Sequence, residues 1–382
     1  MNQQQQQQQQ QDVVFEGNSC VKKVTLNRPR KLNSLTYGMV SQMLKKLNEF
    51  ETDPSVKLVI LKGNGKAFCS GGDIVDLYGH SPPGQWRLKE SFYKKQLIID
   101  YLLATYKKPL VALINGIVMG GGAGLSMHAK FKIVTENTVF AMPEVAIGHV
   151  PDVGASHFLS RLPGYFGEYL GLTGTRLRGA DMIACELATH FLLSKDLHLL
   201  ENALDKVTSS DTAAISQLLS KFTLGKNDLK EQSAYYTSRL PIINKCFSRE
   251  TVEDILLALE KQAEIGKEKW VVDAINSLKS TCPTSLKICL RSLREGRWQS
   301  LEQCLARDYT ISYRTAASHD FYEGVRAMLF DKDKNPKWQP SKLELVTEEM
   351  IDQYFVEVKD DKSEPLRLPP RSNSIVAATS KL

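Results

Sequence analysis

Two carboxylates, Glu144 and Asp152, lie eight residues apart in the apolar, loop-rich segment of residues 140–154. Burial of a carboxyl group raises its pKa, which makes the group a usable acid or base near neutral pH. Distant cations could equally pair with both side chains, since ion pairs also perturb carboxylates. The segment therefore predicts either an acid–base pair or two structural ion pairs.

Two glycine clusters could present backbone N–H groups to a ligand. Gly71 and Gly72 follow the strand expected at residues 56–61, and three glycines at 120–122 follow an apolar run at residues 110–114. Free N–H groups at the start of a helix, together with the helix dipole, stabilise an anion or a carbonyl oxygen that becomes one. Glycine also serves tight turns and close packing of a helix on a strand. Each cluster thus predicts a donor site for an oxygen or, as the alternative, a structural turn.

Cysteine and histidine spacing argues against a metal centre. The seven cysteines are scattered without a C-x-x-C pair, and no H-E-x-x-H occurs. We therefore expect reduced thiols and no bound metal. His128 and His149 are expected to be packed side chains, with ligand contact as the alternative. That alternative carries more weight for His149, because it lies between the two acids.

Composition places the chain among soluble globular proteins. It has 382 residues, of which 42% are hydrophobic and 24% charged. No apolar run approaches the roughly 18 residues of a membrane span. The net charge of +6 is spread along the chain. This distribution argues against a dedicated nucleic-acid-binding protein and suits a polyanionic small ligand.

The elements that must position these residues fall into two regions. Residues 20–191 alternate short β-branched runs with helical stretches, the pattern of an α/β domain, whereas amphipathic helical spacing dominates beyond residue 192. We predict, in chain order, a disordered glutamine tract, a core, a helical region and an exposed tail, at residues 1–11, 12–192, 193–356 and 357–382.

Four motifs in this order resemble the enoyl-CoA hydratase/isomerase (crotonase) superfamily over about residues 12–356. They are Asn27-Arg28-Pro29 with Leu32-Asn33-Ser34-Leu35, the run from Ala67 to Asp73, the run from Met119 to Gly122, and Pro143-Glu144. The resemblance implies an α/β (α+β) fold, with a crotonase-like spiral of ββα units followed by a helical C-terminal region. It also implies that the small-molecule substrate is an acyl-CoA.

Within the superfamily, the chain resembles the 3-hydroxyisobutyryl-CoA hydrolase branch. Gly124 stands where hydratases carry a glutamate, while Pro151-Asp152-Val153-Gly154 and residues 317–338 are similar to this branch. The resemblance implies hydrolysis of 3-hydroxyisobutyryl-CoA to 3-hydroxyisobutyrate and CoA in valine catabolism. One alternative is a hydrolase or hydratase for another acyl-CoA, and the other is a catalytically silent CoA-binding protein. Departures from the branch at His149-Val150 and Ala155-Ser156-His157 favour the first of these.

The resemblance also assigns roles to single residues. The N–H groups of Gly72 and Gly121 would stabilise the thioester oxygen as it becomes negative. Glu144 would be the catalytic carboxylate, either attacking directly or activating a water. Asp152 would bind the 3-hydroxyl group or share the proton transfer, and Gln96 would contact the same hydroxyl. CoA is part of the substrate and product, so no cofactor is expected.

The last three residues, Ser380-Lys381-Leu382, have the form of the peroxisomal address that an import receptor reads. We therefore predict a peroxisomal protein with that receptor as a partner. Lys31 and Lys332 are candidates for contact with CoA phosphates, with plain solvation as the alternative. Superfamily relatives commonly form trimers, which makes a homo-oligomer an open expectation.

Overall fold

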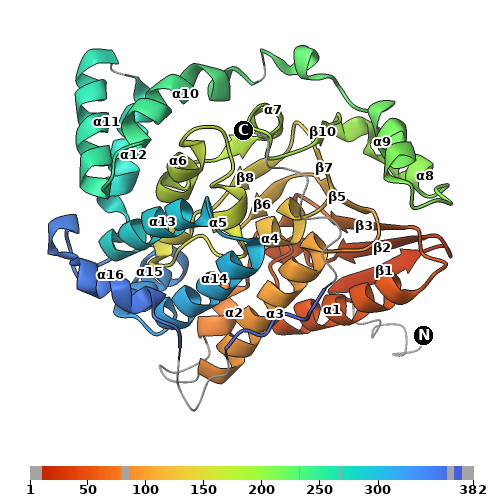
Figure 1. Cartoon of the computed structure of the whole chain (residues 1–382), viewed down its shortest axis with the longest axis horizontal. Coiled ribbons are helices and arrows are strands. Elements are labelled where there is room, and N and C mark those ends of the chain that lie inside the picture. The colour runs from red at the N-terminus through yellow and green to blue at the C-terminus, as the bar shows by residue number, and fades with distance from the viewer. Residues whose placement is uncertain (1–10, 80–85, 232, 267, 359–364, 372–382) are drawn as a thin grey trace, which may run out of the picture.

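The computed structural model describes residues 11–79, 86–231, 233–266, 268–358 and 365–371. At its centre is a six-stranded sheet in the order β1-β2-β3-β5-β7-β10, in which β1 is antiparallel to β2 and the other neighbours are parallel (Figure 1). Its strands are β1 (Val13–Gly17), β2 (Val21–Leu26), β3 (Leu58–Gly63), β5 (Leu110–Ile114), β7 (Phe131–Val134) and β10 (His190–Phe191).

A second sheet has four strands in the order β4-β6-β8-β9, and its last pair is antiparallel. Its strands are β4 (Ala67–Cys69), β6 (Ile117–Met119), β8 (Val139–Ala141) and β9 (Leu177–Arg178). From β3 onward the chain visits a strand of the first sheet, then a strand of the second, then a helix, and repeats this order at β5 and β7. The repetition confirms the expected spiral of ββα units.

Helices surround the sheets and make up most of the second half of the chain. The first half contains α1 (Tyr37–Thr52), α2 (Ile74–Gly79), α3 (Trp86–Ala104), α4 (Gly121–Met127), α5 (Ala155–Phe158), α6 (Phe166–Thr173) and α7 (Gly179–Ala184). They are followed by α8 (Leu197–Leu204), α9 (Thr212–Ser220), α10 (Ala234–Phe247), α11 (Val252–Gly266), α12 (Lys269–Ser280), α13 (Pro283–Gly296), α14 (Leu301–Thr315), α15 (His319–Val325) and α16 (Glu348–Phe355). Short 3₁₀ helices lie at Pro29–Lys31, Glu144–Ile147, Ser194–Asp196, Lys226–Leu229 and Leu343–Leu345, and a π-helical turn at Arg326–Phe330.

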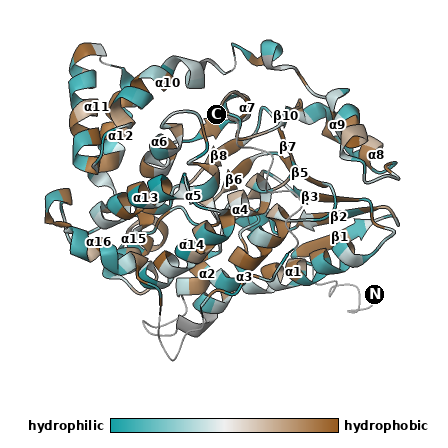
Figure 2. Cartoon of the chain, viewed as in Figure 1, coloured by the Kyte–Doolittle hydropathy of each residue, from teal (hydrophilic) through white to brown (hydrophobic). Residues whose placement is uncertain are grey.

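The central strands are covered on both faces, which explains their unbroken apolar sequences. In β3, Leu58 and Ile60 belong to the same apolar cluster as Leu200 of α8, whereas Val59 and Leu61 belong to the larger core cluster that includes the buried side of α1. Colouring by hydropathy shows these strands as hydrophobic and the outer helices as two-sided (Figure 2). The central strands therefore lie between α8 on one side and α1 on the other.

The C-terminal helices approach the core closely at the turn after β8. A Cβ atom on Gly148 would lie 2.3 Å from the carbonyl oxygen of Asp320, and one on Gly324 would lie 2.4 Å from the carbonyl carbon of Ile147. Because these contacts leave no room for side chains, the backbone of α15 lies directly on the 3₁₀ helix Glu144–Ile147. The C-terminal region therefore lies directly beside the segment that carries Glu144.

The described part of the tail, residues 365–371, lies along α3 and α14. Leu366 and Leu368 pack with Tyr101 of α3 and Leu305 of α14, and Arg371 forms an ion pair with Glu51 (Figure 1). Residues 366, 368 and 371 are half-buried, and residues 365, 367, 369 and 370 are exposed. The glutamine tract at residues 1–10 and the terminal tripeptide lie outside the described residues.

None of the helices that the structure describes is both long and apolar enough to cross a membrane. The same residues contain no group of three or more histidine, cysteine, aspartate or glutamate side chains that could hold a metal ion. The boundary at residue 192 between the core and the helical region stays a prediction.

Candidate active site

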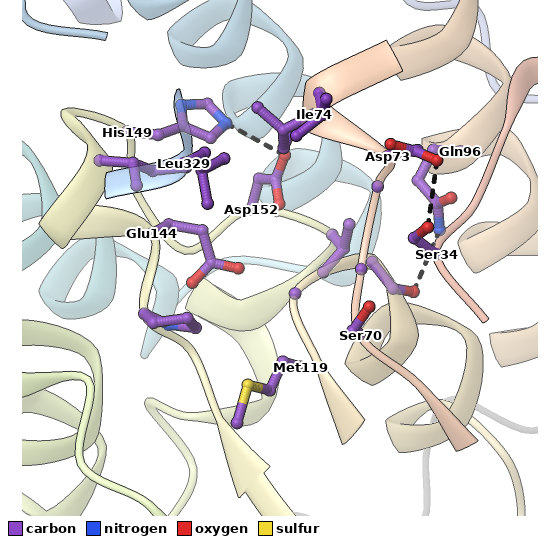
Figure 3. Close-up of a pocket in the computed structure, with 18 of the residues that line it drawn as sticks. Ser34, Ser70, Asp73, Ile74, Gln96, Met119, Glu144, His149, Asp152 and Leu329 are labelled. Atoms are coloured by element: carbon purple, nitrogen blue, oxygen red, sulfur yellow. Dashed lines mark hydrogen bonds and ion pairs between the residues drawn. The ribbon is translucent and has the colours of Figure 1, made fainter. Parts of the chain in front are cut away.

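A cavity of about 580 Å³ opens between the loops after β4 and β6, the 3₁₀ helix Glu144–Ile147 and the C-terminal helices. All five residues predicted to act on the substrate line it, namely Gly72, Gln96, Gly121, Glu144 and Asp152. Figure 3 shows Glu144 and Asp152 on one side of the cavity, and Gln96 with Ser34 and Asp73 on the other. The structure thus brings together residues that the sequence spreads over 80 positions.

Gly72 and Gly121 lie next to each other at the floor of the cavity. A Cβ atom built on Gly121 would be 3.5 Å from the backbone nitrogen of Gly72. Gly121 is the first residue of α4, so its N–H has no partner within the helix. Gly120, which precedes it, has φ +51°. This left-handed conformation favours glycine, which has no Cβ to clash there.

The motif residues near the N-terminus hold the Gly72 loop in place. The Leu35 N–H donates to the Gly71 carbonyl at 2.8 Å, and the Asp73 N–H donates to the Leu35 carbonyl at 2.9 Å. Arg28 Nη1 lies 3.0 Å from Asp73 Oδ2 and donates to the Ser34 carbonyl at 2.7 Å. These residues support the loop through a short parallel bridge between Leu35 and Gly72.

Glu144 is the first residue of its 3₁₀ helix, and its side chain points into the cavity (Figure 3). Its Oε1 atom lies 3.0 Å from where a Cβ atom on Gly120 would be, and its Oε2 atom is buried without a hydrogen-bond partner. Burial, and secondarily the charge of Asp152, raise the pKa of the Glu144 carboxyl well above its usual range. Glu144 is therefore a carboxyl group that accepts a proton readily, beside the two glycine N–H groups.

Asp152 faces Glu144 from a strained loop. The side chains of His128 and Asp308 form hydrogen bonds with the backbone of the two residues that follow Asp152. Val153 has φ +55°, and its carbonyl lies 2.9 Å from His128 Nε2. Burial lowers the pKa of His128 to about 4, so the neutral ring donates this bond. On the other side of Val153, the Gly154 N–H donates to Asp308 Oδ2 at 2.8 Å. Together His128 and Asp308 fix the direction in which Asp152 points.

Replacing Asp308 by Asn should make stability less dependent on pH. Burial, partly offset by the charge of Arg307, raises the pKa of Asp308 to about 7. A folded-state pKa above the unfolded value means that the native protein loses stability as pH rises from about 4 to about 7. Asp308→Asn keeps an oxygen acceptor for the Gly154 N–H and does not titrate. Urea unfolding at pH 5 and pH 8 measures the free energy of unfolding of both proteins. We expect the variant to be more stable relative to the wild type at pH 8 than at pH 5. The same difference in stability at both pH values would contradict the raised pKa of Asp308.

Gln96 contacts a carboxyl group that the sequence analysis missed. Its Nε2 donates to Asp100 Oδ1 at 2.9 Å and lies 3.4 Å from the Gly121 carbonyl oxygen. Burial, followed by the Asp152 charge, raises the pKa of Asp100 well above its usual range. Asp100 is the one acidic side chain among residues 97–103, which are otherwise apolar or tyrosine. That isolation is a signal that could have identified it.

Asp100 also fills the space that a side chain at position 124 would need. A Cβ atom on Gly124 would lie 2.8 Å from both Asp100 oxygens and 2.7 Å from Val153 Cβ. The position therefore has no room for any side chain. The packing of α3 against α4 therefore excludes a glutamate at position 124.

Gly124→Ala should accordingly lower the free energy of unfolding by about 1–3 kcal/mol, the usual cost of overpacking a core. The expected loss reverses the small gain that alanine normally gives over glycine within a helix. Chemical denaturation of the purified variant measures the difference. A variant as stable as the wild type would show that the Asp100 carboxyl moves aside.

The C-terminal helices contribute cavity residues that sequence reasoning did not find. Met328 and Leu329 line the cavity together with Tyr93 of α3, and so do Arg176 and the predicted Lys31. Lys332 is not among the lining residues. Met328 and Leu329 lie in the π-helical turn after α15 and belong to no motif, so only the tertiary packing of that turn reveals them.

Comparison with known proteins agrees with this architecture. Residues 21–355 match the enoyl-CoA hydratase/isomerase family. The chain is 51% identical over 373 residues to 3-hydroxyisobutyryl-CoA hydrolase 1 of Arabidopsis thaliana, with 97% of each chain covered. It is 41% identical over 345 residues to the mitochondrial 3-hydroxyisobutyryl-CoA hydrolase of Rattus norvegicus, with 90% of this chain and 88% of the relative covered.

These relatives correct the expected localisation. Those whose names state a location are mitochondrial, which points to mitochondria and makes the peroxisomal prediction from Ser380-Lys381-Leu382 wrong. A tripeptide address acts only when a receptor reads it, and its three residues carry far less information than a match along most of the chain.

The fold leads to the same family. A crystal structure of a carnitinyl-CoA dehydratase from Mycobacterium thermoresistibile superposes with a TM-score of 0.82 at 34% identity, covering 94% of this chain and 98% of that one. The family match and the named relatives extend across both the spiral core and the C-terminal helices. The chain belongs to the enoyl-CoA hydratase/isomerase family, in the branch of proteins named 3-hydroxyisobutyryl-CoA hydrolases.

Proposed function

We propose that this protein is a thioester hydrolase that cleaves 3-hydroxyisobutyryl-CoA to 3-hydroxyisobutyrate and CoA, as a step of valine breakdown. The names of its relatives support the substrate. The observation that carries the chemistry is the shared cavity, in which two carboxyl groups, Glu144 and Asp152, face two adjacent glycine N–H groups.

In the proposed mechanism, the thioester oxygen lies between the N–H groups of Gly72 and Gly121. Attack on the carbonyl carbon places a negative charge on this oxygen, and the two fixed donors stabilise that charge. Each donor contributes roughly 2.7–4 kcal/mol, as measured where one has been removed from another enzyme. Glu144 takes a proton from the attacking water, a role that suits a carboxyl group whose pKa is raised by burial.

Asp152 provides the second polar contact in this proposal. Its Oδ2 atom lies 3.4 Å from both His149 and Ser312, which leaves Oδ1 for the 3-hydroxyl group of the substrate. Acyl groups without that hydroxyl would leave a buried polar atom unpaired, which penalises them. Gln96 supports the same hydroxyl without charge. CoA enters as part of the substrate and leaves as product, so the reaction needs no resident cofactor.

The test is the release of free thiol from 3-hydroxyisobutyryl-CoA by the purified protein. Crotonyl-CoA and acetyl-CoA run in parallel, and Glu144→Gln serves as the blank. We expect fast release from the hydroxyacyl substrate alone, and its loss in the variant. Release from acetyl-CoA at the same rate would overturn the substrate assignment. Binding of CoA without release from any substrate would instead favour a catalytically silent CoA-binding protein.

A further inference from the structure

The chain after α15 makes a π-helical turn at Arg326–Phe330, which is wider than an α-helical turn. The Asp331 N–H donates to the Arg326 carbonyl, five residues back, at 2.9 Å. Two residues that follow the turn, Lys332 and Lys334, have φ +58° and +54°, a region that non-glycine residues seldom adopt. Turns of this kind and strained backbone occur often at functional sites, and they persist only where surrounding contacts hold them.

The side chain of Arg326 ties the two ends of this turn together. Its Nε and Nη2 atoms each lie 2.8 Å from a carboxylate oxygen of Glu323, which precedes the turn. Its Nη1 atom lies 2.5 Å from Asp331 and 2.7 Å from Asp333, which follow the turn. The hydrogen bonds from Arg326 lower the pKa of Glu323 to about 2. A two-pronged contact within such a network fixes geometry better than a single exposed ion pair does.

The π-helical turn brings Leu329 to the wall of the cavity. Leu329 shares this position with Ile74 of α2 and with Ile147, the last residue of the 3₁₀ helix that begins at Glu144. All three pack against one small apolar cluster, which consists of Tyr78, Ala316, Phe321 and Val325. The apolar part of the wall is therefore assembled from three separate stretches of the chain.

This apolar wall lies beside the two carboxyl groups of the site. Figure 3 shows Leu329 on the same side of the cavity as Glu144 and Asp152. The ring of His149 connects the wall to Asp152, because it packs on Phe321 at a centroid distance of 5.4 Å and its Nε2 atom lies 3.4 Å from Asp152 Oδ2. A substrate that reaches Asp152 therefore meets an apolar surface to which Leu329 contributes.

The substrate proposed above carries a methyl branch at C2. In the proposed mechanism, its thioester oxygen lies between Gly72 and Gly121, and its 3-hydroxyl group binds Asp152. C2 is bonded to both C1 and C3, so it must lie between these contacts, and its branch needs an apolar surface. Apolar side chains pack closely around what they bind, so a wall that fits a methyl group must move to admit a longer branch.

We propose that Leu329 limits the branch at C2 of the acyl group to the size of a methyl group, and that Arg326 fixes Leu329 in place through the π-helical turn. The proposal rests on the thioester hydrolysis described above. It names the acyl class that fits, namely 3-hydroxyacyl groups with hydrogen or methyl at C2. Leu329 contacts the substrate, whereas Arg326 is not among the lining residues and is a positioning residue.

The first experiment compares kcat/KM for thiol release from 3-hydroxyisobutyryl-CoA and from 2-ethyl-3-hydroxypropionyl-CoA, which has one more methylene in the branch. The ethyl substrate should be about 10- to 100-fold poorer for the wild type, because its branch must displace packed side chains. Leu329→Ala should bring the two substrates within about threefold of each other. Equal hydrolysis of both by the wild type, or an unchanged ratio in the variant, would overturn the proposal.

Two further variants decide whether the effect belongs to Leu329. Leu329→Phe adds volume and should disfavour 3-hydroxyisobutyryl-CoA relative to 3-hydroxypropionyl-CoA, which has no branch. Met119→Ala is the matched control for added space, because Met119 of β6 lines the same cavity and lies on the other side of Glu144 from Leu329 in Figure 3. Its ethyl-to-methyl ratio should equal that of the wild type. If Met119→Ala admits the ethyl branch as well as Leu329→Ala does, Leu329 does not set the limit.

Arg326→Gln tests the positioning role. The variant leaves three carboxylates without their shared cation, so the turn is held less firmly and the ethyl-to-methyl ratio should rise about three- to tenfold. Arg291→Gln is the matched control, because Arg291 is also 35% exposed and lies 2.9 and 2.5 Å from Glu295 and Asp352, away from the cavity. A loss of stability lowers both rates together, so its ratio should match the wild type. An unchanged ratio in Arg326→Gln would contradict the role of Arg326.

A binding experiment separates this proposal from the proposed function. CoA thioethers with a 3-hydroxy-2-methylpropyl or a 2-ethyl-3-hydroxypropyl group have no carbonyl group and cannot be hydrolysed. Calorimetry should show the methyl thioether binding about tenfold more tightly than the ethyl thioether to the wild type, and equally to Leu329→Ala. A wild type that releases no thiol but keeps this pattern contradicts the proposed function alone. Equal binding of both thioethers to the wild type overturns the role of Leu329.

Discussion

Glu144→Gln should abolish most thiol release, reducing kcat by about 10²–10⁴-fold, while the protein becomes more stable at neutral pH. The rate falls because the amide cannot take a proton from water. The stability rises because the wild type keeps a buried carboxyl group whose pKa burial raises well above the usual range. Such a carboxyl group lowers the stability of the native state as the pH rises from the pKa of the unfolded chain, about 4.3, through the higher pKa of the folded protein. Thermal unfolding at pH 8 and at pH 4 should show the gain at pH 8 only.

The same substitution at Glu168 provides a contrast. Glu168 is also buried, but Arg297 Nη2 lies 2.7 and 3.0 Å from its two carboxylate oxygens. Glu168→Gln removes the partner of a cation and should lower stability at pH 8. The two variants therefore separate a carboxylate kept for chemistry from one kept for structure. Equal stability losses in both would contradict the assignment of Glu144.

Gly121→Ala should reduce kcat/KM by about 10²–10³-fold without unfolding the protein. The new methyl group would lie 3.5 Å from the Gly72 nitrogen and 3.3 Å from Leu35 Cδ1. The methyl group would therefore occupy the space proposed for the thioester oxygen. The loss corresponds to roughly one oxygen-stabilising donor. Alanine within α4 is otherwise favourable to the helix, so stability should change little. Thiol release and urea unfolding measure the two effects separately.

Gly38→Ala is the matched control for this prediction. Gly38 is also in the first turn of its helix, α1, and among the described residues a Cβ atom there has only Thr36 Oγ1 within 4 Å, at 3.8 Å. Its rate should equal that of the wild type. If Gly121→Ala retains full activity as well, the oxygen of the substrate does not lie between Gly72 and Gly121.

Fold elements with local signals could be predicted from the sequence. Helix α1 is an example, because Thr36 Oγ1 accepts from the Met39 N–H and thereby sets where the helix begins. Val40, Met43 and Leu47 then fall on one buried face at helical spacing. The continuous apolar sequence of β3 likewise indicated a strand buried on both faces.

The candidate site was only partly predictable. The family resemblance implied that Gly72, Gly121 and Glu144 act on one substrate, and in the structure all three line the same cavity. The distant contacts around its second carboxylate, Asp152, could not be found, because Asp308 contacts Gly154 and Thr315 contacts His149 across 154 and 166 positions. Such pairs depend on how α14 packs, and single-sequence patterns carry no information about that packing.

The close packing of α15 on the 3₁₀ helix Glu144–Ile147, at Gly148 and Gly324, makes the active site depend on a part of the chain that is synthesised late. The glycine loops and Glu144 leave a ribosome well before α14 and α15, and chains generally fold in the order in which they are made. Until those helices dock, Asp152 lacks Ser312 and the cavity lacks the wall formed by Met328 and Leu329. A chain without those helices therefore has the glycine loops and Glu144 but lacks that wall of the cavity, and we expect it not to cleave the thioester.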